Sequence, residues 1–427
     1  MQTVNFSKKI PSIGHYDVAV LGGGPAGVAA AVEAARGGAK VILIEASGML
    51  GGMATTALVG PFMTSYDRAG ERPTVGGIFR EIVTRLTECG GAIAPEDTDS
   101  PSIHTSFIGK YHRHVTPFDP FLIQIVLDEM CAEAGVQVLL YTRFADCIAE
   151  GGEIKAVILA ALEGLRSVSA DIYIDCTGNA DVAYAAGVPT WKGEEESGVP
   201  QPGTLMFEVN NVSDSGFVAH PKPPVKAYRM PSLGRYKVNH LRVFGVDATD
   251  SASMTKGHTE ARRQVLEAFR VLHDETPGFE NAILTQVAPV LGVRESRHID
   301  GVYKLTVADV SGGTKFEDRI AAYAFGMDVH PRNPEMKGNF KIEIANVYYI
   351  PYRCMLPKGC DNLLVAGKTV SSESQAAGGL RVMPCAMAIG QAAGAAAVIA
   401  KKCGVAVGEV SIPELRSLLT EHGAILD

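Results

Sequence analysis

Residues 16–45 read YDVAVLGGGPAGVAAAVEAARGGAKVILIE and decide the fold of this chain. An apolar run at residues 16–21 has the composition of a buried strand, and the alanine-rich residues 28–36 have that of a helix. A glycine pair then ends the helix, and residues 40–45 form a second apolar run. Strand, helix and strand within about 30 residues match a minimal βαβ unit. The sequence therefore predicts an α/β fold with a parallel sheet.

The loop between the first strand and the helix has GxGxxG spacing, made by Gly22, Gly24, Pro25, Ala26 and Gly27. Gly22 permits a tight turn, Gly24 lets the backbone approach a pyrophosphate, and Gly27 lets the helix pack closely on the strand. The helix N-terminus adds free N–H groups and a positive dipole end. Glu45 ends the second strand, where an acid accepts ribose hydroxyls. The order of these elements predicts a dinucleotide site, whereas the glycines alone would fit an ordinary turn.

A second glycine-rich segment, residues 47–56 (SGMLGGMATT), follows directly. Its small and hydroxyl residues suit a chain that runs along a pyrophosphate, although a structural loop has the same composition. The candidate cofactor contacts here are Ala46, Gly51, Gly52, Met53 and Thr55.

The middle of the chain predicts further elements of the same fold. Asp119 and Pro120 begin a helix that Gly135 ends, and residues 136–141 form a strand. Residues 153–162 and 165–170 alternate as a small antiparallel excursion, and residues 171–178 form a buried strand that ends at Thr177-Gly178.

The C-terminal part repeats the strand–glycine–helix order. Residues 362–367 form a strand that runs into Gly367, followed by Lys368. Gly378 and Gly379 then precede a long helix of small residues from about 384 to 402. The start of such a helix suits a flavin, because its N–H groups stabilise the reduced, anionic ring. A packed alanine helix with no ligand is the alternative.

Composition limits the class of protein. Hydrophobic residues make up 46% of the 427 residues, which is enough for a sizeable core. The formal net charge of −8 argues against a nucleic-acid partner. The eight cysteines show no CxxC spacing, so we expect reduced thiols and no metal site. No apolar stretch reaches about 20 uninterrupted residues, so we expect no membrane span and a cytoplasmic location.

Several further segments are similar to one known family. They are LGGMATT (50–56), IDCTGNADVA (174–183), LGVRESRHIDGVYKLT (291–306), YIPYRCMLPK (349–358) and NLLVAGKTVSSESQAAGGLRVMPCAMAIGQAAGAAA (362–397). With them the chain resembles the FAD-dependent oxidoreductase family often called FAD_oxidored, within the glutathione reductase/fumarate reductase superfamily. The likeness runs from residue 16 to about residue 401.

This resemblance implies FAD as the cofactor, with contacts at Thr177, Gly178, Gly367, Lys368, Gly379 and Val382 besides the residues above. It implies a Rossmann-like FAD-binding domain of the GR2 type, a parallel sheet plus a β-meander, with an inserted α+β substrate domain. We expect the FAD domain at residues 1–60, 116–190 and 341–427. The inserted domain would take residues 61–115 and 191–340. Lys368 departs from the acid common at this position in the superfamily, and no second GxGxxG unit for a nicotinamide cofactor appears.

Catalytic candidates come from segments that match the family. They are Arg294, Arg297, His330, Tyr349, Arg353 and Arg381, with Glu295 and Asp328 beside them. Cations would hold substrate or developing charge, and His330 would serve as acid or base. The run 294–297 (RESR) fits a substrate clamp and an internal salt-bridge network equally well, and His330 also fits a structural role.

These features favour an oxidoreductase that transfers a hydride between flavin N5 and a small polar metabolite, with an external electron partner. Alternatives are a flavoprotein of the tRNA-modifying or thiazole-forming type, or a non-catalytic FAD-binding protein. A homodimer is the expected assembly.

Overall fold

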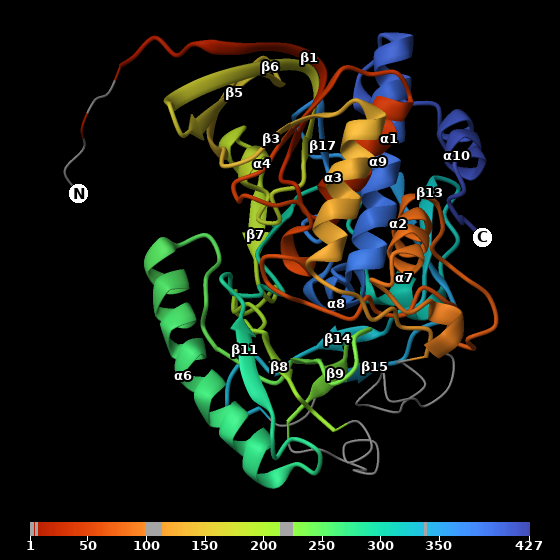
Figure 1. The fold of residues 1–427 in the computed structure, drawn as a ribbon. Helices are drawn as coiled ribbons and strands as arrows, with labels where there is room; N and C mark the ends of the chain where they lie inside the picture. The colour runs from red at the N-terminus through yellow and green to blue at the C-terminus, as the bar shows by residue number, and fades with distance from the viewer. Residues whose placement is uncertain (1–3, 5–6, 99–112, 214–224, 337–339) are drawn as a thin grey trace.

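The computed structural model describes residues 4, 7–98, 113–213, 225–336 and 340–427 (Figure 1). Its largest sheet has seven strands in the order β3-β2-β1-β6-β5-β4, and β17 also pairs with β6. These strands are β1 (Ser12–Leu21), β2 (Val41–Ile44), β3 (Gln137–Leu139), β4 (Arg143–Glu150), β5 (Glu153–Ala161), β6 (Gly164–Asp175) and β17 (Leu363–Val365).

The β1–β2 unit confirms the predicted βαβ crossover. Strands β3, β2, β1, β6 and β17 pair in parallel, and α1 (Pro25–Arg36) connects β1 to β2. Side chains alternate between two cores, because successive residues of a strand face opposite sides of the sheet. Val18 and Val20 pack beneath the helices, whereas Ala19 and Leu21 pack beneath the meander.

The meander follows the prediction in part. Strand β5 pairs antiparallel with the first half of β6, as expected. The sequence did not reveal β4, which pairs antiparallel with β5 and has mostly exposed side chains. Residues 165–170 and 171–175, expected as separate strands, form one continuous strand, β6. The second half of β6 pairs with β17, so one strand joins the parallel sheet to the meander.

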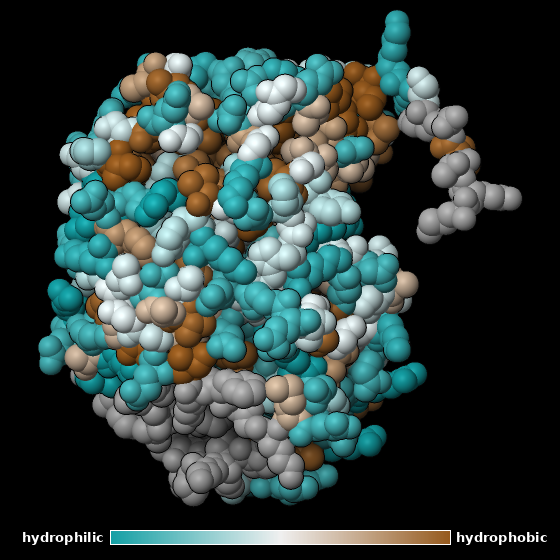
Figure 2. Space-filling model, turned by 180° about the vertical axis from the view of Figure 1, so that it is seen from behind, coloured by the Kyte–Doolittle hydropathy of each residue, from teal (hydrophilic) through white to brown (hydrophobic). Residues whose placement is uncertain are grey.

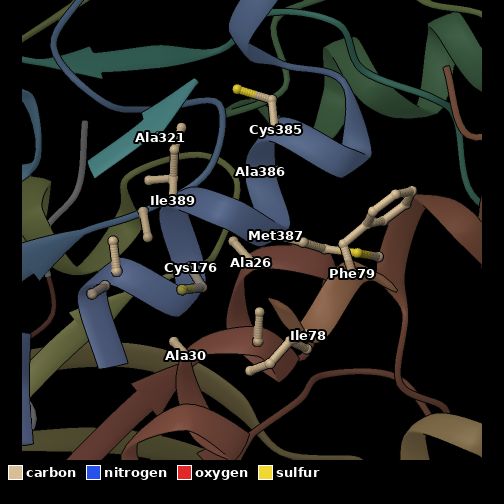
Figure 3. Close-up of a cluster of buried hydrophobic side chains, with 14 of the residues drawn as sticks. Ala26, Ala30, Ile78, Phe79, Cys176, Ala321, Cys385, Ala386, Met387 and Ile389 are labelled. Atoms are coloured by element: carbon tan, nitrogen blue, oxygen red, sulfur yellow. The ribbon is translucent and has the colours of Figure 1, made fainter. Parts of the chain in front are cut away.

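Four helices cover the other face of the sheet: α1, α2 (Gly77–Glu88), α3 (Leu122–Ala134) and α9 (Met383–Cys403) (Figure 1). Figure 3 shows this core, to which α1 contributes small side chains, α9 contributes small and sulfur-containing ones, and α2 contributes Ile78 and Phe79. A Cβ atom at Gly390 would lie 2.1 Å from the Ala26 carbonyl oxygen, and one at Gly394 would lie 2.4 Å from that of Ala30. The glycines of α9 therefore allow α1 and α9 to touch along their length.

Helix α9 is also the one helix in the described residues that is long and apolar enough to cross a membrane. The protein itself buries 94% of its most apolar window. Its composition is accounted for by packing against α1, α2 and the sheet.

A second, smaller core lies below this assembly in Figure 1. It joins a four-stranded antiparallel sheet, in the order β11-β8-β10-β9, to helix α6 (Ser251–Glu275). Its strands are β8 (Phe207–Asn210), β9 (Ala227–Arg229), β10 (Tyr236–Val238) and β11 (Ile283–Val287). The sequence predicted this helix only from residue 259. It begins earlier because the Asp250 side chain accepts a hydrogen bond from the Ser253 amide, which caps it.

The remaining elements connect or extend these two cores. Three two-stranded sheets pair β7 with β12, β13 with β16 and β14 with β15. Their strands are β7 (Thr190–Lys192), β12 (Arg297–Ile299), β13 (Arg319–Tyr323), β14 (Met327–Val329), β15 (Phe340–Ile342) and β16 (Tyr348–Pro351). The other helices are α4 (Asp181–Ala185), α7 (Val307–Gly312), α8 (Ser374–Leu380), α10 (Ile412–Glu421) and the short 3-10 turns η1 (Gly52–Ala54), η2 (Pro95–Thr98), η3 (Tyr352–Met355) and η4 (Val407–Glu409).

The domain boundaries stay a prediction. Residues 191–340 contain the antiparallel sheet and α6, but β13 and β14 contribute to the larger core. Helix α2, in the expected insert at residues 61–115, also packs in the larger core.

Candidate active site

One cavity of about 1810 Å³ runs between the two cores. Its lining comes from both the seven-stranded sheet and the antiparallel sheet regions, and the space-filling view is deeply notched between these two parts (Figure 2). Single ligand pockets usually measure about 300–1,000 Å³. The cavity therefore has room for a dinucleotide and a second molecule.

The glycine loop lines one end of this cavity. Gly22, Gly24, Pro25 and Ala26 all face it. A Cβ atom at Gly24 would meet no protein atom within 4 Å, so the space beside this backbone is open to a ligand. Helix α1 begins here with no side-chain cap, which leaves its first N–H groups for an anion.

Gly27 has a different role from Gly24. A Cβ atom at this position would lie 1.8 Å from the Gly22 carbonyl oxygen. Gly27 thus holds the helix close to the loop and does not line the cavity. Its predicted packing role fits this position, and direct contact with a cofactor does not.

The acid at the end of β2 is fixed beside the loop. One oxygen of Glu45 accepts a hydrogen bond from the Gly23 amide at 2.8 Å, and the other accepts one from the Ser47 amide at 2.7 Å. Glu45 and Ala46 both line the cavity. The carboxylate is therefore held where a ribose would lie next to the glycine loop.

The second glycine segment folds back onto the first. Gly51 has a φ of 98° and donates its amide hydrogen to the Gly23 carbonyl at 2.8 Å, which brings Gly52 and Met53 to the cavity wall. Gly51 itself and Thr55 do not line the cavity. The Thr55 hydroxyl donates to the Leu50 carbonyl at 2.7 Å and so stabilises the turn.

Thr177 and Gly178 line the cavity where β6 ends. Asp175, which the sequence analysis did not single out, fixes this loop. Its buried carboxylate accepts hydrogen bonds from the Thr177 amide at 3.0 Å, the Thr177 hydroxyl at 2.7 Å and the Ala183 amide at 3.0 Å. The sequence signal that could have revealed Asp175 was an acidic residue within an apolar strand.

The C-terminal segment supplies the opposite wall. Gly367, Lys368 and Val382 line the cavity, and α9 begins there with no side-chain cap. The Lys368 ammonium donates to the Val293 carbonyl at 3.1 Å, and burial, with the charge of Arg381, lowers its pKa to about 8. Gly379 was expected at the flavin, but it lies inside α8. A Cβ atom there would lie 2.6 Å from the Tyr348 hydroxyl, so glycine is needed at this position for packing.

Three predicted residues meet in the wall of the same cavity. Asp328 Oδ2 accepts a hydrogen bond from Arg381 Nη2 at 2.7 Å and lies 3.1 Å from His330 Nε2. All three residues line the cavity. Burial alone would raise the pKa of Asp328, but the hydrogen bond with His330 and the charge of Arg381 hold it well below its usual range.

The structure separates the residues of the 294–297 run. Arg294 lines the cavity, and Glu295 does not. Glu295 is buried and pairs with Arg332 at 2.7 Å, and it also contacts Ser374. Arg297 pairs with Asp181 at 2.8 Å and covers the Tyr184 ring. Arg294 therefore remains a clamp candidate, whereas Glu295 and Arg297 belong to internal networks.

Two further catalytic candidates lie away from the cavity. Arg353 pairs with Asp318 at 2.8 Å and keeps 45% of its side chain exposed. Tyr349 packs beneath the charges of Lys315 and Arg319. We therefore withdraw Arg297, Arg353 and Tyr349 as residues that touch a ligand in this cavity.

Four cavity residues were missed because they lie in the antiparallel sheet region, outside every recognised motif. Lys226, Tyr228, His240 and Arg242 line the same cavity as Arg294 and Asp328, and the charges of Arg294 and Asp328 act on Lys226 and Tyr228. The pKa of Lys226 is lowered by burial and by Arg242, and that of His240 by burial and by both cations. The available sequence signal was the density of basic residues between positions 222 and 242.

The buried pair of Glu295 and Arg332 gives a stability prediction. Glu295→Gln removes one charge and leaves the other buried, which costs about 3–5 kcal/mol of unfolding free energy. The measurement is urea unfolding at neutral pH. The exposed Glu71→Gln serves as the matched control and should change stability by less than about 0.5 kcal/mol. If Glu295→Gln were as stable as Glu71→Gln, the ion pair of Glu295 and Arg332 would contribute nothing to stability.

Comparison with known proteins gives the family. A family model described as FAD dependent oxidoreductase matches residues 17–419. The chain belongs to this family. The protein is accordingly an FAD-dependent oxidoreductase with FAD as its cofactor, and the open space at Gly24 and the uncapped starts of α1 and α9 fit that group.

Individual relatives add less. A soluble pyridine nucleotide transhydrogenase from Marinomonas sp. (strain MWYL1) is 58% identical over 41 residues, which is 10% of this chain and 9% of that protein. The p-nitrophenol 4-monooxygenase PnpA from Pseudomonas putida DLL-E4 is 11% identical with a TM-score of 0.52, covering 96% of this chain and 85% of that one. The flavin-dependent brominase Bmp2 is 12% identical with a TM-score of 0.51, covering 96% and 83%. The two structural likenesses concern the fold of this FAD-dependent oxidoreductase.

Within the described residues, no group of three or more His, Cys, Asp and Glu side chains is placed to hold a metal ion.

Proposed function

We propose that this FAD-dependent oxidoreductase transfers a hydride between flavin N5 and a small polar metabolite, and that an external partner completes the electron balance. The observation that carries the proposal is one continuous cavity, whose lining includes both the nucleotide loop and a set of ionisable side chains. We also propose a GR2-type FAD domain with an inserted substrate domain, since β-meander, parallel sheet and antiparallel sheet occur in that arrangement.

Several residues that line the cavity support the proposed contacts with FAD. The loop at Gly22–Gly24 and the start of α1 would hold the pyrophosphate, and Glu45 the adenosine ribose. The start of α9 at Val382 would face the ring system, where its dipole stabilises negative charge. When bound, FAD supplies a hydride acceptor or donor at N5.

The ionisable side chains of the cavity would bind the metabolite and move its proton. Arg294 and Arg381 offer positive charge to substrate oxygens. Burial lowers the pKa of His330 to about 4, so the imidazole is neutral at pH 7 and is ready to accept a proton.

A substrate screen tests this proposal. Purified holoprotein is mixed anaerobically with metabolite pools, and loss of the oxidised-flavin absorbance is recorded. A substrate should bleach the flavin, and air or a dye should restore it. If light reduces the flavin normally but no metabolite bleaches it, the alternative of a non-catalytic FAD-binding protein is favoured.

The nicotinamide question gives a separate prediction. Within the described residues, every parallel strand pair belongs to the seven-stranded sheet, which leaves no second dinucleotide fold. We expect NADH and NADPH to reduce the flavin slowly, if at all, in stopped-flow measurements. Fast, saturable reduction by either at micromolar concentration would contradict this prediction.

We also propose the class of partner, the location and the oligomeric state of the enzyme. The net charge of −8 argues for a small-molecule substrate rather than a nucleic acid, and hence against the tRNA-modifying alternative. The thiazole-forming alternative stays open until a substrate is known. We propose a cytoplasmic enzyme that needs no membrane, and a homodimer, which gel filtration with light scattering would test.

A further inference from the structure

Asp328 decides which nitrogen of the His330 ring can accept a proton. Its Oδ2 atom lies 3.1 Å from His330 Nε2 and accepts a hydrogen bond from Arg381 Nη2 at 2.7 Å. Although burial opposes ionisation, these two neighbours hold the pKa of the carboxylate well below its usual range, so it can only accept hydrogen bonds. Nε2 must therefore carry the hydrogen of the neutral imidazole, and Nδ1 keeps a free lone pair.

The backbone around the ring is also held in place. The His330 amide donates a hydrogen bond to Gln201 Oε1 at 3.1 Å, and the Gln201 amide donates one to the Glu295 carboxylate at 2.8 Å. Helix α8 packs closely on the preceding strand, because a Cβ atom at Gly378 would lie 3.2 Å from the Asp328 backbone nitrogen. These contacts fix the position of the imidazole.

His330 Nδ1 is buried, and it has no hydrogen-bond partner among the described residues. The residue lines the cavity and is only 7% exposed. A buried acceptor without a partner is costly and unusual in proteins, and it often marks a catalytic group or a bound ligand. Because Nδ1 is an acceptor, the group that binds there must donate a hydrogen.

Arg294 restricts the charge of that group. Within the described residues Arg294 pairs with no carboxylate, and its hydrogen bond goes to the neutral Pro202 carbonyl at 2.6 Å. Burial, with the charge of Arg381, lowers its pKa to about 9, so it stays charged at pH 7, and this charge acts on His330. An ammonium group at Nδ1 would face a like charge, whereas an ionised carboxylate has no hydrogen to donate.

Tyr228 adds a hydroxyl to the same wall. It lies in β9 and lines the cavity, and its hydroxyl has no hydrogen-bond partner in the part of the chain that the structure describes. The charges of Asp328 and Arg294 act on Tyr228 as they act on His330, so the two side chains share one region of the cavity. Burial, with the charge of Asp328, raises the pKa of Tyr228 well above its usual range, so the hydroxyl keeps its proton and can donate it in a hydrogen bond.

We propose that this region of the cavity binds the hydroxyl group of an alcohol, which donates a hydrogen bond to His330 Nδ1 and accepts one from the Tyr228 hydroxyl. A hydroxyl group does both with one oxygen and carries no charge. The substrate of the enzyme is then a member of an alcohol–carbonyl pair. The inference rests on the proposed function, because it takes the same cavity as the substrate chamber.

The reaction balances with FAD as the co-reactant. When the alcohol is oxidised, its O–H bond breaks and the proton goes to His330 Nδ1. The C–H bond also breaks, its hydrogen and electron pair leave as a hydride for flavin N5, and a C=O bond forms. The substrate loses two electrons and the flavin gains them, and the reverse reaction returns both the proton and the hydride. In either direction the Tyr228 hydrogen bond stabilises negative charge on the substrate oxygen.

The first test measures binding to FAD-loaded protein at constant ionic strength. Lactate, alanine and propionate share one carbon skeleton and carry a hydroxyl, an ammonium group or a hydrogen at the same carbon. Cyclohexanol and cyclohexylamine form a pair without a carboxylate. We expect at least one alcohol to shift the visible flavin spectrum with an affinity roughly 10-fold or more above that of its analogues, because a site that hydrogen-bonds a hydroxyl rejects molecules that lack it. An amine that binds as tightly as its alcohol, or no binding by either alcohol, would overturn the inference.

Tyr228→Phe removes the donor and keeps the ring. It should weaken binding of the alcohol by roughly 3- to 10-fold, the usual contribution of a neutral hydrogen bond, and leave the melting temperature unchanged. Tyr184→Phe removes a hydroxyl from an exposed ring outside the cavity and is the matched control. Equal affinity of the Tyr228→Phe and Tyr184→Phe proteins for the alcohol would contradict the proposed contact.

A second measurement needs no ligand and serves if Tyr228→Phe folds poorly. Nitrogen-15 NMR of histidine-labelled holoprotein at pH 7 reports which ring nitrogen carries the hydrogen, and His330→Gln assigns the signal. We expect the hydrogen on Nε2 of His330. A hydrogen on Nδ1 would remove the acceptor on which the inference depends.

Failure of this inference differs from failure of the proposed function. If an amine or a saturated acid bleaches the flavin and the alcohols do not bind, the oxidoreductase stands and the hydroxyl assignment falls. If the alcohols bind with the expected preference but no metabolite bleaches the flavin, the hydroxyl site stands and hydride transfer falls.

Discussion

Gly24→Val is expected to give folded but colourless protein. The backbone at Gly24 is extended, with a φ of −72° and a ψ of −173°, so valine adopts it without strain. The new side chain would enter the open space beside the glycine loop, where no protein atom lies within 4 Å. That space is where a pyrophosphate must approach the backbone. We expect FAD affinity to fall by roughly 100-fold or more, because each tenfold loss needs only about 1.4 kcal/mol.

The measurement is the ratio of flavin to protein absorbance after purification, with circular dichroism to follow the fold. Gly312→Val is the matched control, since its Cβ atom also meets no protein atom and it is exposed at the end of α7. Gly27→Val should behave differently from both, because its Cβ atom would clash with the Gly22 backbone and disturb the fold itself. Full flavin occupancy in Gly24→Val would show that the phosphate loop is wrongly assigned.

The nucleotide end was predictable because its requirements are local. The loop at Gly22–Gly27 needs particular residues at fixed spacing, and the strands on either side are continuous apolar runs. The long helix near residue 384 was predictable for the same reason, although its glycines proved to serve contact with α1. Strand β4 was missed because its side chains are mostly exposed and give no apolar pattern.

The substrate end was only partly predictable, because it depends on which residues the fold brings together. Arg294 and Arg297 are three positions apart, yet one lines the cavity and the other pairs with Asp181. Arg353 stands in a segment typical of the family but pairs with Asp318 near the surface. Lys226 and Arg242 belong to no motif, and only the antiparallel sheet places them opposite Arg294. Motif membership therefore located the cofactor better than the substrate.

The chemistry at His330 also needed the structure. The sequence analysis relied on the ordinary histidine pKa near 6.5. Burial lowers the pKa of His330 to about 4; the hydrogen bond to Asp328 opposes this shift, and the charge of Arg294 adds to it. The imidazole is therefore neutral from pH 8 down to about pH 5. As a base it should give a rate of flavin reduction that is flat over that range and falls as the pH approaches 4, where the imidazole gains a proton.

His330→Ala is expected to lower the rate of flavin reduction by roughly 10²–10⁴-fold, the usual contribution of a positioned acid or base. FAD content should not change, because His330 is not part of the glycine loop that would hold the pyrophosphate. His330→Gln keeps a polar group beside Asp328 but cannot take up the proton, so it should be as slow as the alanine variant.

Free imidazole should partly restore the rate of His330→Ala and leave that of His330→Gln unchanged, because only the smaller side chain makes room for it. His273→Ala, at a partly exposed position on α6, controls for loss of a histidine as such. Reduction at the parental rate in His330→Ala, with FAD bound, would make His330 a structural residue. If His330→Gln reduces the flavin at the parental rate and His330→Ala does not, the hydrogen bond of residue 330 matters rather than its uptake of a proton.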